Sequence, residues 1–496
     1  MERVDPAHAI LAFTECTADG LREDVAETAG EHGLKKELRL RDLVPMQILL
    51  MVGVSWAGIA AKQGSTHPMI WIAGILFFFL PQAMVVTYCA RLWPIEGGVY
   101  QWAKFALGPL AGFLSAWNYA LYVILTVSGL GILTVTSLSY ALGPGAAWMA
   151  DSQWLTFTLD GVLLGLVFVV NVVGFHFGKW VSHFGTGMML LLTLTFFVLL
   201  FWHPAATAVH PHVAPQRPFA LGWPVLSILT LNLYVKVAFN AYSGLEQVAV
   251  FAGETKNAGR AIVMSAWIAA PAIVVIYVLM TGSMLTYVPA DRIDLAGSIP
   301  QVLAAAFGGA GTGVWIGRVM ILALAAFTIC SYILLTAETS RLPMVAGWDA
   351  VLPEWFTRLN PRFGTPVRSL MVIVGIAAVF SVLASLGAGR QEAYQVLSTS
   401  GQLMFGLYYC AMFAVPLFAG SRFAAIPKSD RPGFWLKACA VSGLTITVVQ
   451  TVLATVPIVD VNNTWGYAAK VGGTGLAINL VGAAIYWQGK KAARAR

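Results

Sequence analysis

Long apolar runs, separated by short polar segments, dominate the chain from residue 43 to residue 489. A helix needs roughly 20 consecutive apolar residues to cross the hydrocarbon core of a membrane. Ten stretches without Asp, Glu, Lys or Arg suit such helices: residues 43–61, 69–90, 105–150, 180–201, 261–290, 319–337, 369–389, 393–421, 438–459 and 471–489. Two further spans carry internal charges: 154–175 contains Asp160, and 223–251 contains Lys236 and Glu246. The pattern predicts an all-α integral membrane protein with 12 transmembrane helices.

The basic residues predict how these helices are oriented. The first apolar run begins only at Leu43, so we expect no signal peptide and a polar N-terminal tail over residues 1–42. If this tail is cytoplasmic, 23 of the 30 Lys and Arg residues lie on the cytoplasmic side, in agreement with the positive-inside rule. We therefore expect a multi-pass protein of the plasma or inner membrane, with both termini in the cytoplasm.

Composition excludes several classes of protein. Hydrophobic residues make up 58% of the chain and charged residues 11%, whereas soluble domains carry about 25% charged residues. The net charge of +7 comes from the loops that flank the membrane, so we expect the lipid bilayer, and no nucleic acid, as a partner. The sequence contains no metal-ligand cluster, nucleophile motif or phosphate-binding loop, so we expect no enzyme activity, no metal and no cofactor.

Two of the predicted spans contain small and polar residues at mid-depth. The first has two glycines around a serine in residues 53–58, and the sixth has the segment 240–244 between Lys236 and Glu246. Either segment alone is also explained by close packing of small residues between helices. The two segments lie five spans apart, however, and paired interruptions in corresponding halves are typical of inverted-repeat transporters. An interruption at this depth must line a cavity or be buried in protein.

Four motifs resemble those of the amino acid–polyamine–organocation (APC) superfamily of transporters. They are Ser-Trp-Ala-Gly-Ile-Ala at 55–60, Pro-Ile-Glu-Gly-Gly-Val-Tyr-Gln-Trp at 94–102, Tyr-Ser-Gly-Leu-Glu at 242–246 with Gly-Glu-Thr-Lys-Asn at 253–257, and Ser-Arg-Leu at 340–342 followed by Asn-Pro-Arg-Phe-Gly-Thr-Pro at 360–366. The resemblance covers about residues 35 to 420. It implies the leucine-transporter fold, a 5+5 inverted repeat with two C-terminal helices.

The implied organisation divides the chain into five parts. These are an N-terminal tail (1–42), the first repeat (43–201), the second repeat (223–421), two accessory helices (433–489) and a C-terminal tail (490–496).

The resemblance also implies a substrate site where the two broken helices meet. Amide groups near a helix N-terminus suit a carboxylate, and unwound carbonyl groups suit an ammonium group. The implied substrate-binding residues are Gly53, Ser55, Trp56, Ala57, Gly58, Phe239, Asn240, Tyr242, Ser243 and Gly244. Many relatives have a gating aromatic residue where this chain has Asn240, with Phe239 before it.

Several residues are candidates for coupling transport to an ion or for gating it. Some relatives replace a sodium ion with a lysine beside a serine, and these positions fall at Met189 and Ser331. Glu246 either braces the unwound backbone or takes part in substrate or proton binding. Lys236 either reaches towards water or lines the outer vestibule. Glu96 and Glu254 are candidates for an inner gate, and the spacing of Glu338 and Arg341 predicts an ion pair between them.

These observations favour a secondary active transporter for an amino acid, neutral or zwitterionic, with H⁺ or Na⁺ as a possible coupling ion. Two alternatives stay open, a polyamine or choline-like cation carrier and a transporter-like receptor that binds an amino acid without moving it.

Overall fold

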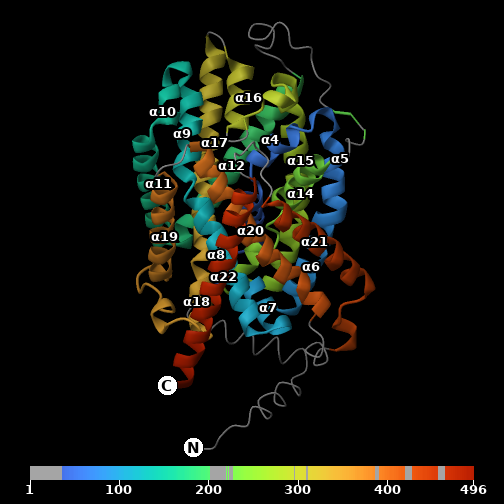
Figure 1. The fold of residues 1–496 in the computed structure, drawn as a ribbon, viewed down its shortest axis with the longest axis vertical. Helices are drawn as coiled ribbons and strands as arrows, with labels where there is room; N and C mark the ends of the chain where they lie inside the picture. Colours follow the sequence, from blue (N-terminus) through green and yellow to red (C-terminus); the bar gives the residue numbers. More distant parts are fainter. Residues whose placement is uncertain are drawn as a thin grey trace, which may run out of the picture.

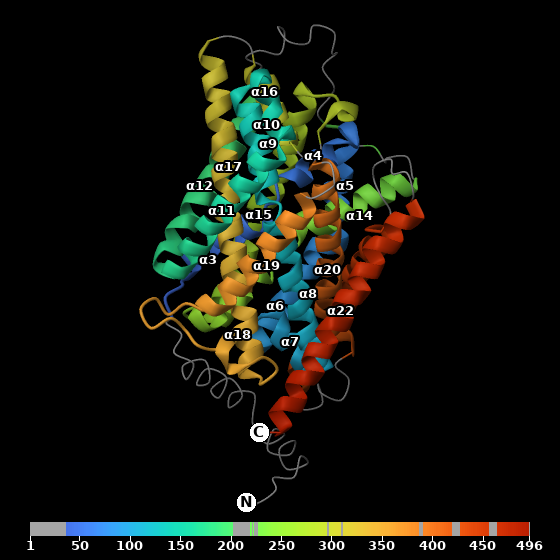
Figure 2. The same ribbon diagram turned by 60° about the vertical axis from the view of Figure 1, so that its left-hand side comes forward.

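The computed structural model describes residues 36–201, 219–220, 222, 227–294, 297–308, 311–385, 390–418, 427–455 and 464–495. Within these residues the regular structure is helical, except for an isolated bridge between Leu38 and Thr255. Most of the long helices run roughly along the long axis of the molecule (Figure 1). Both views place α16 near one end of the bundle and α7 and α18 at the other, which we call the α7 end (Figure 1 and Figure 2).

The helices follow one another along the chain in three groups. The first comprises α3 (Leu40–Met51), α4 (Ser55–Ala61), α5 (His67–Gly74), the π-helical turn η2 (Ile75–Phe79), α6 (Leu80–Leu92), α7 (Val99–Leu107), α8 (Pro109–Val127), α9 (Leu130–Leu142), α10 (Ala147–Asp151), α11 (Gln153–Val173) and α12 (Phe175–Phe201). The second comprises α14 (Ile228–Tyr242), the 3₁₀ helix η4 (Gln247–Glu254), α15 (Ala258–Tyr287), α16 (Ser298–Phe307), α17 (Thr312–Thr339), α18 (Arg341–Trp348), α19 (Val367–Ser385) and α20 (Arg390–Phe418). The third comprises α21 (Phe434–Leu453) and α22 (Thr464–Ala495).

Eight helical stretches in the described residues are long and apolar enough to cross a membrane. They are Gly64–Leu92, Pro109–Leu142, Gln153–Val173, Gly178–Phe201, Ala258–Tyr287, Thr312–Trp348, Ser398–Phe418 and Phe434–Leu453. The pair α3 and α4 adds a ninth if it is counted as one bent span. The chain is therefore an all-helical, multi-pass membrane protein with eight to nine candidate spans in the part that is described. Three other helices, α14, α19 and α22, lie at the remaining positions where the sequence predicts spans.

Both predicted interruptions are present, although each lies a few residues from the middle of its motif. The first separates α3 from α4 at residues 52–54 and bends the span by 49°. The second follows Tyr242 at residues 243–246, after which the chain continues as the 3₁₀ helix η4. Gly244 has a φ of +117°, a conformation that favours glycine, and a Cβ there would come within 2.9 Å of Met51 Cγ. The two interruptions therefore lie against each other.

Asp160 caps a third discontinuity, between α8 and α9. The side chain of Asp160 is only 2% exposed. Its Oδ1 accepts a hydrogen bond of 2.6 Å from the amide of Gly131, in the first turn of α9. The first amides of a helix lack partners within the helix, so this carboxylate satisfies one of them from a neighbouring span.

Contacts between distant segments hold the α7 end together. Tyr100 and Lys104 of α7 both donate hydrogen bonds to the carboxylate of Asp349, which follows α18. Lys490 of α22 donates to the Asp349 carbonyl at 3.4 Å. Higher in the bundle, Asn118 of α8 and Asn479 of α22 exchange side-chain hydrogen bonds of 2.7 and 3.0 Å. The contacts of Lys490 and Asn479 hold α22 along one side of the bundle (Figure 2).

Candidate functional site

A cavity of about 170 Å³ lies where the two interrupted helices meet. The first interrupted helix contributes a continuous segment, residues 50–56, and the second contributes Asn240, Ser243 and Gln247. The remaining walls come from α8, α9, α16, α17 and α20: Tyr122, Leu125, Thr126, Gly129, Leu133, Ser137, Ser298, Ile299, Pro300, Leu324, Phe327, Thr328, Ser331, Tyr332, Leu335, Ser398, Gln402 and Phe405.

The cavity wall combines apolar side chains with uncharged polar groups. None of the described residues that line it is Asp, Glu, Lys, Arg or His. Its polar groups are hydroxyls and amides, such as those of Ser55, Asn240 and Gln247, and leucine and phenylalanine side chains form the apolar part. Ligand pockets in general combine apolar walls with a few such orienting groups. The cavity suits a small molecule that has polar groups, an apolar part and no net charge.

Tyr277 of α15 braces the first interruption. The amide of Gly53 donates a hydrogen bond of 3.0 Å to its hydroxyl, and the hydroxyl donates to the Met51 carbonyl at 3.2 Å. Ser331 of α17 donates to the carbonyl of Leu49 at 2.8 Å. Backbone groups freed by the break are thus satisfied from two neighbouring helices, as a membrane interior requires.

Glu246 and Tyr409 brace the second interruption. The hydroxyl of Tyr409 accepts a hydrogen bond of 2.6 Å from the amide of Gly244 and donates one of 2.6 Å to Glu246 Oε2. Gln82 Nε2 donates to the same carboxylate oxygen at 3.0 Å. Glu246 is fully buried and does not line the cavity. These contacts match the bracing alternative for Glu246.

Six of the predicted site residues line the cavity, and the other ten do not. Gly53, Ser55, Trp56, Asn240, Ser243 and Ser331 line it. Ala57, Gly58, Phe239, Tyr242, Gly244, Met189, Lys236 and Glu246 do not, and neither do Glu96 and Glu254.

The residues behind the cavity mostly pack the helices around it. Phe239 is buried against Phe78 and Tyr409, at ring-centroid distances of 5.3 and 5.1 Å. Tyr242 is buried with its ring 5.6 Å from that of Trp71. Met189 is completely buried in α12, and Lys236 is only 4% exposed in α14.

Gly58 faces α16 and not the cavity. A Cβ atom at Gly58 would overlap with Cβ and Oγ of Ser298, the first residue of α16. The glycine is therefore required for close packing of α4 on α16, a common use of small residues in membrane helices.

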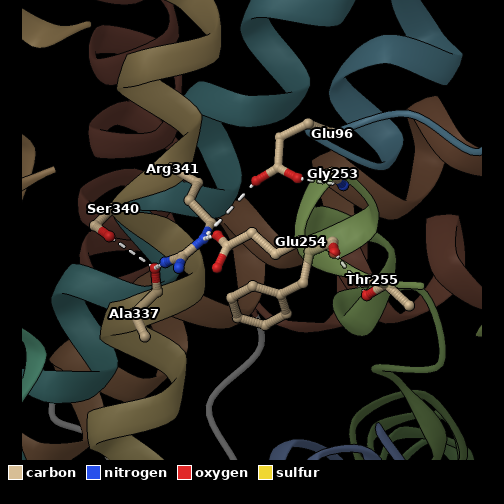
Figure 3. Close-up of polar contacts among 8 residues, drawn as sticks. Glu96, Gly253, Glu254, Thr255, Ala337, Ser340 and Arg341 are labelled. Atoms are coloured by element: carbon tan, nitrogen blue, oxygen red, sulfur yellow. Dashed lines mark hydrogen bonds and ion pairs between the residues drawn. The ribbon is translucent and has the colours of Figure 1, made fainter. Parts of the chain in front are cut away.

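A buried charge cluster lies at the α7 end, made of Glu96, Glu254 and Arg341. Arg341 Nε lies 2.6 Å from Glu254 Oε1 and 3.8 Å from Glu96 Oε1 (Figure 3). Glu96 Oε2 accepts a hydrogen bond of 2.7 Å from the amide of Gly253. The Arg341 guanidinium also lies over the ring of Phe251, 4.7 Å from its centroid. The cluster thus ties the loop after α6, the end of η4 and the start of α18 together.

The predicted ion pair between Glu338 and Arg341 is wrong. Arg341 turns towards Glu254 and Glu96, two residues that come from distant parts of the chain, and Glu338 accepts a hydrogen bond of 2.9 Å from Tyr119. The i,i+3 spacing favours a pair on an isolated helix surface, but here α17 ends at Thr339 and α18 begins at Arg341.

The chain before α3 also meets this cluster. The amides of Glu37 and Leu38 donate hydrogen bonds of 2.9 and 3.0 Å to the carbonyl of Glu254, and the amide of Lys256 donates to the Leu38 carbonyl at 2.9 Å. Lys179 of α12 donates to the Glu37 carbonyl at 2.9 Å. The segment that leads into the first interrupted helix is therefore fixed to the end of the second.

Comparison with known proteins identifies the family. The model of the amino acid permease family matches residues 43–476. The chain belongs to the amino acid permease family. It is a member of a transporter family within the APC superfamily and not an enzyme, as the motifs predict.

Individual relatives of this permease share about a quarter of its residues. An uncharacterized transporter (lpg1691) of Legionella pneumophila is 26% identical, over 77% of this chain and 81% of its own length. The branched-chain amino acid permease BcaP of Bacillus subtilis is 25% identical, over 74% of this chain and 78% of its own. The polyamine transporter PUT1 of rice is 23% identical, over 75% of this chain and 66% of its own.

Several residues that shape the site were missed by the sequence analysis. Tyr277, Tyr409 and Gln82 brace the two interruptions, and Gln247 and Ser298 line the cavity. Gln247 directly follows the motif at 242–246, whereas the other four lie outside the quoted motifs. A buried glutamine inside an apolar run was the one available signal, because its amide must find hydrogen-bond partners.

We predict that Gly58→Ala destabilises the permease by about 1–3 kcal/mol, the usual cost of overpacking. The double variant Gly58→Ala/Ser298→Gly should recover most of this loss, because it removes the atoms that the new methyl group meets. Thermal unfolding in detergent measures both. Gly187→Ala is the matched control, since a Cβ at Gly187 has no neighbour within 4 Å. A Gly58→Ala protein as stable as the control would contradict this packing role.

We also predict that Glu96 makes stability depend on pH. Burial, reinforced by the charge of Glu254, raises the pKa of Glu96 from 4.5 to about 8. Between these values the folded state holds the proton more tightly than the unfolded state, so stability falls as pH rises through this window. Glu96→Gln removes this contribution, which is at most about 1.4 kcal/mol per pH unit.

The measurement is the unfolding free energy of the wild type and of Glu96→Gln at several pH values from 5 to 8. The wild type should lose more stability over this range than the variant. Glu354→Gln, a change at an exposed acid, should follow the wild type. Parallel curves for the wild type and Glu96→Gln would refute the prediction.

Proposed function

We propose that this permease is a secondary active transporter that moves a neutral, zwitterionic amino acid across the membrane by alternating access. The observation that carries the proposal is a cavity at the meeting point of two interrupted helices, whose described lining residues offer hydroxyls, amides and apolar side chains but no charged group. A zwitterion has no net charge to neutralise, so it needs dipoles and hydrogen bonds and no countercharge. The relative BcaP, whose name assigns it to branched-chain amino acids, supports the same class of substrate.

The proposed architecture is the leucine-transporter fold with 12 helices. The protein would lie in the plasma or inner membrane, with both termini in the cytoplasm. The repeats then comprise residues 43–201 and 223–421, followed by accessory helices in 433–489. The position of α14, α19 and α22 at the three remaining predicted spans supports this count. The distribution of Lys and Arg supports the orientation. The α7 end is then the cytoplasmic end.

Both interruptions are proposed to hold the charged groups of the substrate. The carboxylate would accept hydrogen bonds from amides around residues 55–58, near the start of α4, where Ser55 and Trp56 line the cavity. The Gly53 amide already donates to Tyr277. The ammonium group was expected at carbonyls near Phe239. That carbonyl already accepts hydrogen bonds from the amide and the hydroxyl of Ser243. We therefore place the ammonium group nearer to Asn240 and Ser243, which line the cavity themselves.

A polyamine or another organic cation is the second candidate, because the relative PUT1 is named a polyamine transporter. A cation carrier would be expected to offer the substrate a carboxylate. The described lining residues include none, and the buried Lys236 lies one turn from Asn240. Both features favour the amino acid over the cation.

Transport by purified protein in liposomes tests the proposal. Counterflow of radiolabelled leucine and alanine should be saturable and should be inhibited by neutral amino acids, whereas putrescine and choline should compete weakly. Inhibition by putrescine alone would favour the cation carrier. Saturable binding of an amino acid without any accumulation or exchange would favour a receptor.

Lys236 gives a sharper prediction about substrate charge. A like charge near the cavity disfavours a cationic substrate by on the order of 1 kcal/mol at an effective dielectric constant of 20, or about fivefold in affinity. Lys236→Met should therefore improve competition by lysine relative to leucine by about this factor. Lys256→Met, a change at an exposed residue near the α7 end, serves as the control. If the two variants show the same ratio, Lys236 does not influence substrate charge.

A further inference from the structure

One face of α17 connects the cavity to the charge cluster at the α7 end. Ser331 and Leu335 line the cavity, Glu338 follows one turn later, and Arg341 begins α18 within the cluster. Residues three and four apart share one face of a helix. Glu338 therefore lies between the space for the substrate and the ion pairs that close the α7 end.

Glu338 is a buried acid without an ionic partner among the described residues. Its side chain has no exposed surface, and the only hydrogen bond it receives there comes from the Tyr119 hydroxyl, at 2.9 Å from Oε2. Its other oxygen, Oε1, is buried and has no hydrogen-bond partner in this part of the chain. A buried carboxylate that lacks a cation is costly, and a proton on the group removes most of that cost.

Two hydrogen bonds connect a side chain of the cavity wall to Glu338. Gln247, which lines the cavity, donates from Nε2 to the Tyr119 hydroxyl at 2.9 Å. The hydroxyl in turn donates its single proton to Glu338 Oε2. Because Oε2 acts as an acceptor, a proton on Glu338 resides on Oε1, the oxygen that has no partner.

The other charged and titratable groups around Glu338 leave it as the neutral acid. Glu246 lies close enough to repel a charge on Glu338. The Glu246 carboxylate accepts hydrogen bonds from Tyr409 and Gln82, whereas the Glu338 carboxylate accepts one hydrogen bond, from Tyr119. Tyr408, whose ring centroid is 4.7 Å from that of Tyr119, and Tyr122 add hydroxyl groups but no cation. Arg341 is the nearest cation, and Glu254 and Glu96 engage it. Hydrogen bonds favour charge on Glu246, so a proton belongs on Glu338.

We propose that Glu338 is a proton-binding site whose occupancy controls the charge cluster at the α7 end. With the proton on Oε1, the acid is neutral and Arg341 stays with Glu254 and Glu96. When the proton leaves from Oε1 to water at the α7 end, the resulting carboxylate competes with Glu254 and Glu96 for Arg341, three residues away. Proton release and opening of the cluster then occur together. The coupling of this step to substrate movement rests on the proposed transport function, but the protonation of Glu338 does not.

Infrared spectroscopy of the purified protein tests the protonation without any substrate. The wild type at neutral pH should show the carbonyl stretch of a protonated carboxyl group, and Glu338→Gln should lack the intensity of one such group. Glu246→Gln, a matched change at a second fully buried acid, should keep it. If Glu338→Gln does not fold, Tyr119→Phe should shift the band, because it removes the hydrogen bond to Oε2. A band that neither Glu338→Gln nor Tyr119→Phe alters would overturn the proposal.

Transport in liposomes tests the coupling. In the wild type an inward proton gradient should drive accumulation of labelled leucine or alanine, and the ratio of this accumulation to equilibrium exchange should fall at least tenfold in Glu338→Gln. Exchange by the variant should also depend less on pH than exchange by the wild type. An unchanged ratio, or a wild type that ignores the gradient, would overturn the coupling. Absence of amino acid exchange in the wild type would instead refute the proposed function, and the infrared result would still decide the protonation.

Discussion

The structure depends on how the backbone groups of two interrupted helices are satisfied inside a membrane. Unpaired amides and carbonyls are costly in hydrocarbon, so each interruption must be enclosed by other helices. Tyr277 supplies hydrogen bonds to the first interruption, and Tyr409, held by Glu246, supplies them to the second. Gln47 of α3 donates to the Gly244 carbonyl at 2.8 Å, so the first interrupted helix also stabilises the second interruption. The cavity is the space left where these braced segments do not fill the bundle.

This constraint explains why the fold was more predictable than the site. Spans and interruptions depend on local sequence, namely on apolar runs and on segments rich in glycine and serine. Both interruptions were therefore predicted to within a few residues. The direction in which a residue points is set by neighbours far along the chain. Gly58 belongs to a motif implied in substrate binding, yet a Cβ there would meet Ser298 of α16. No feature near residue 58 indicates that partner.

The contacts of the charged residues were even harder to predict from local sequence. The sequence identified Glu96 and Glu254 as candidates for an inner gate, but it paired Arg341 with its helical neighbour Glu338. In the fold, the loop after α6, the end of η4 and the start of α18 converge, and Arg341 meets two carboxylates separated by more than a hundred residues. Local spacing contributes only about 0.2–0.5 kcal/mol to an ion pair on a helix. A buried carboxylate with good geometry outweighs that contribution, so local spacing was a poor guide here.

The arrangement of charge along α17 restricts how the α7 end can open. The described residues of the cavity wall are uncharged. Towards the α7 end they are followed by the buried acid Glu338 and then by the buried cluster of Glu96, Glu254 and Arg341. Breaking a buried ion pair by removing one partner costs about 3–5 kcal/mol, because the remaining charge stays uncompensated. A transporter that opens and closes repeatedly has to avoid that cost, so Arg341 must gain a new partner as it leaves Glu254 and Glu96. Water entering from the α7 end is one such partner, and the Glu338 carboxylate near the end of α17, three residues before Arg341, is another. Because Glu338 precedes Arg341 by only three residues, the backbone keeps it near Arg341 in any conformation that preserves the end of α17 and the start of α18.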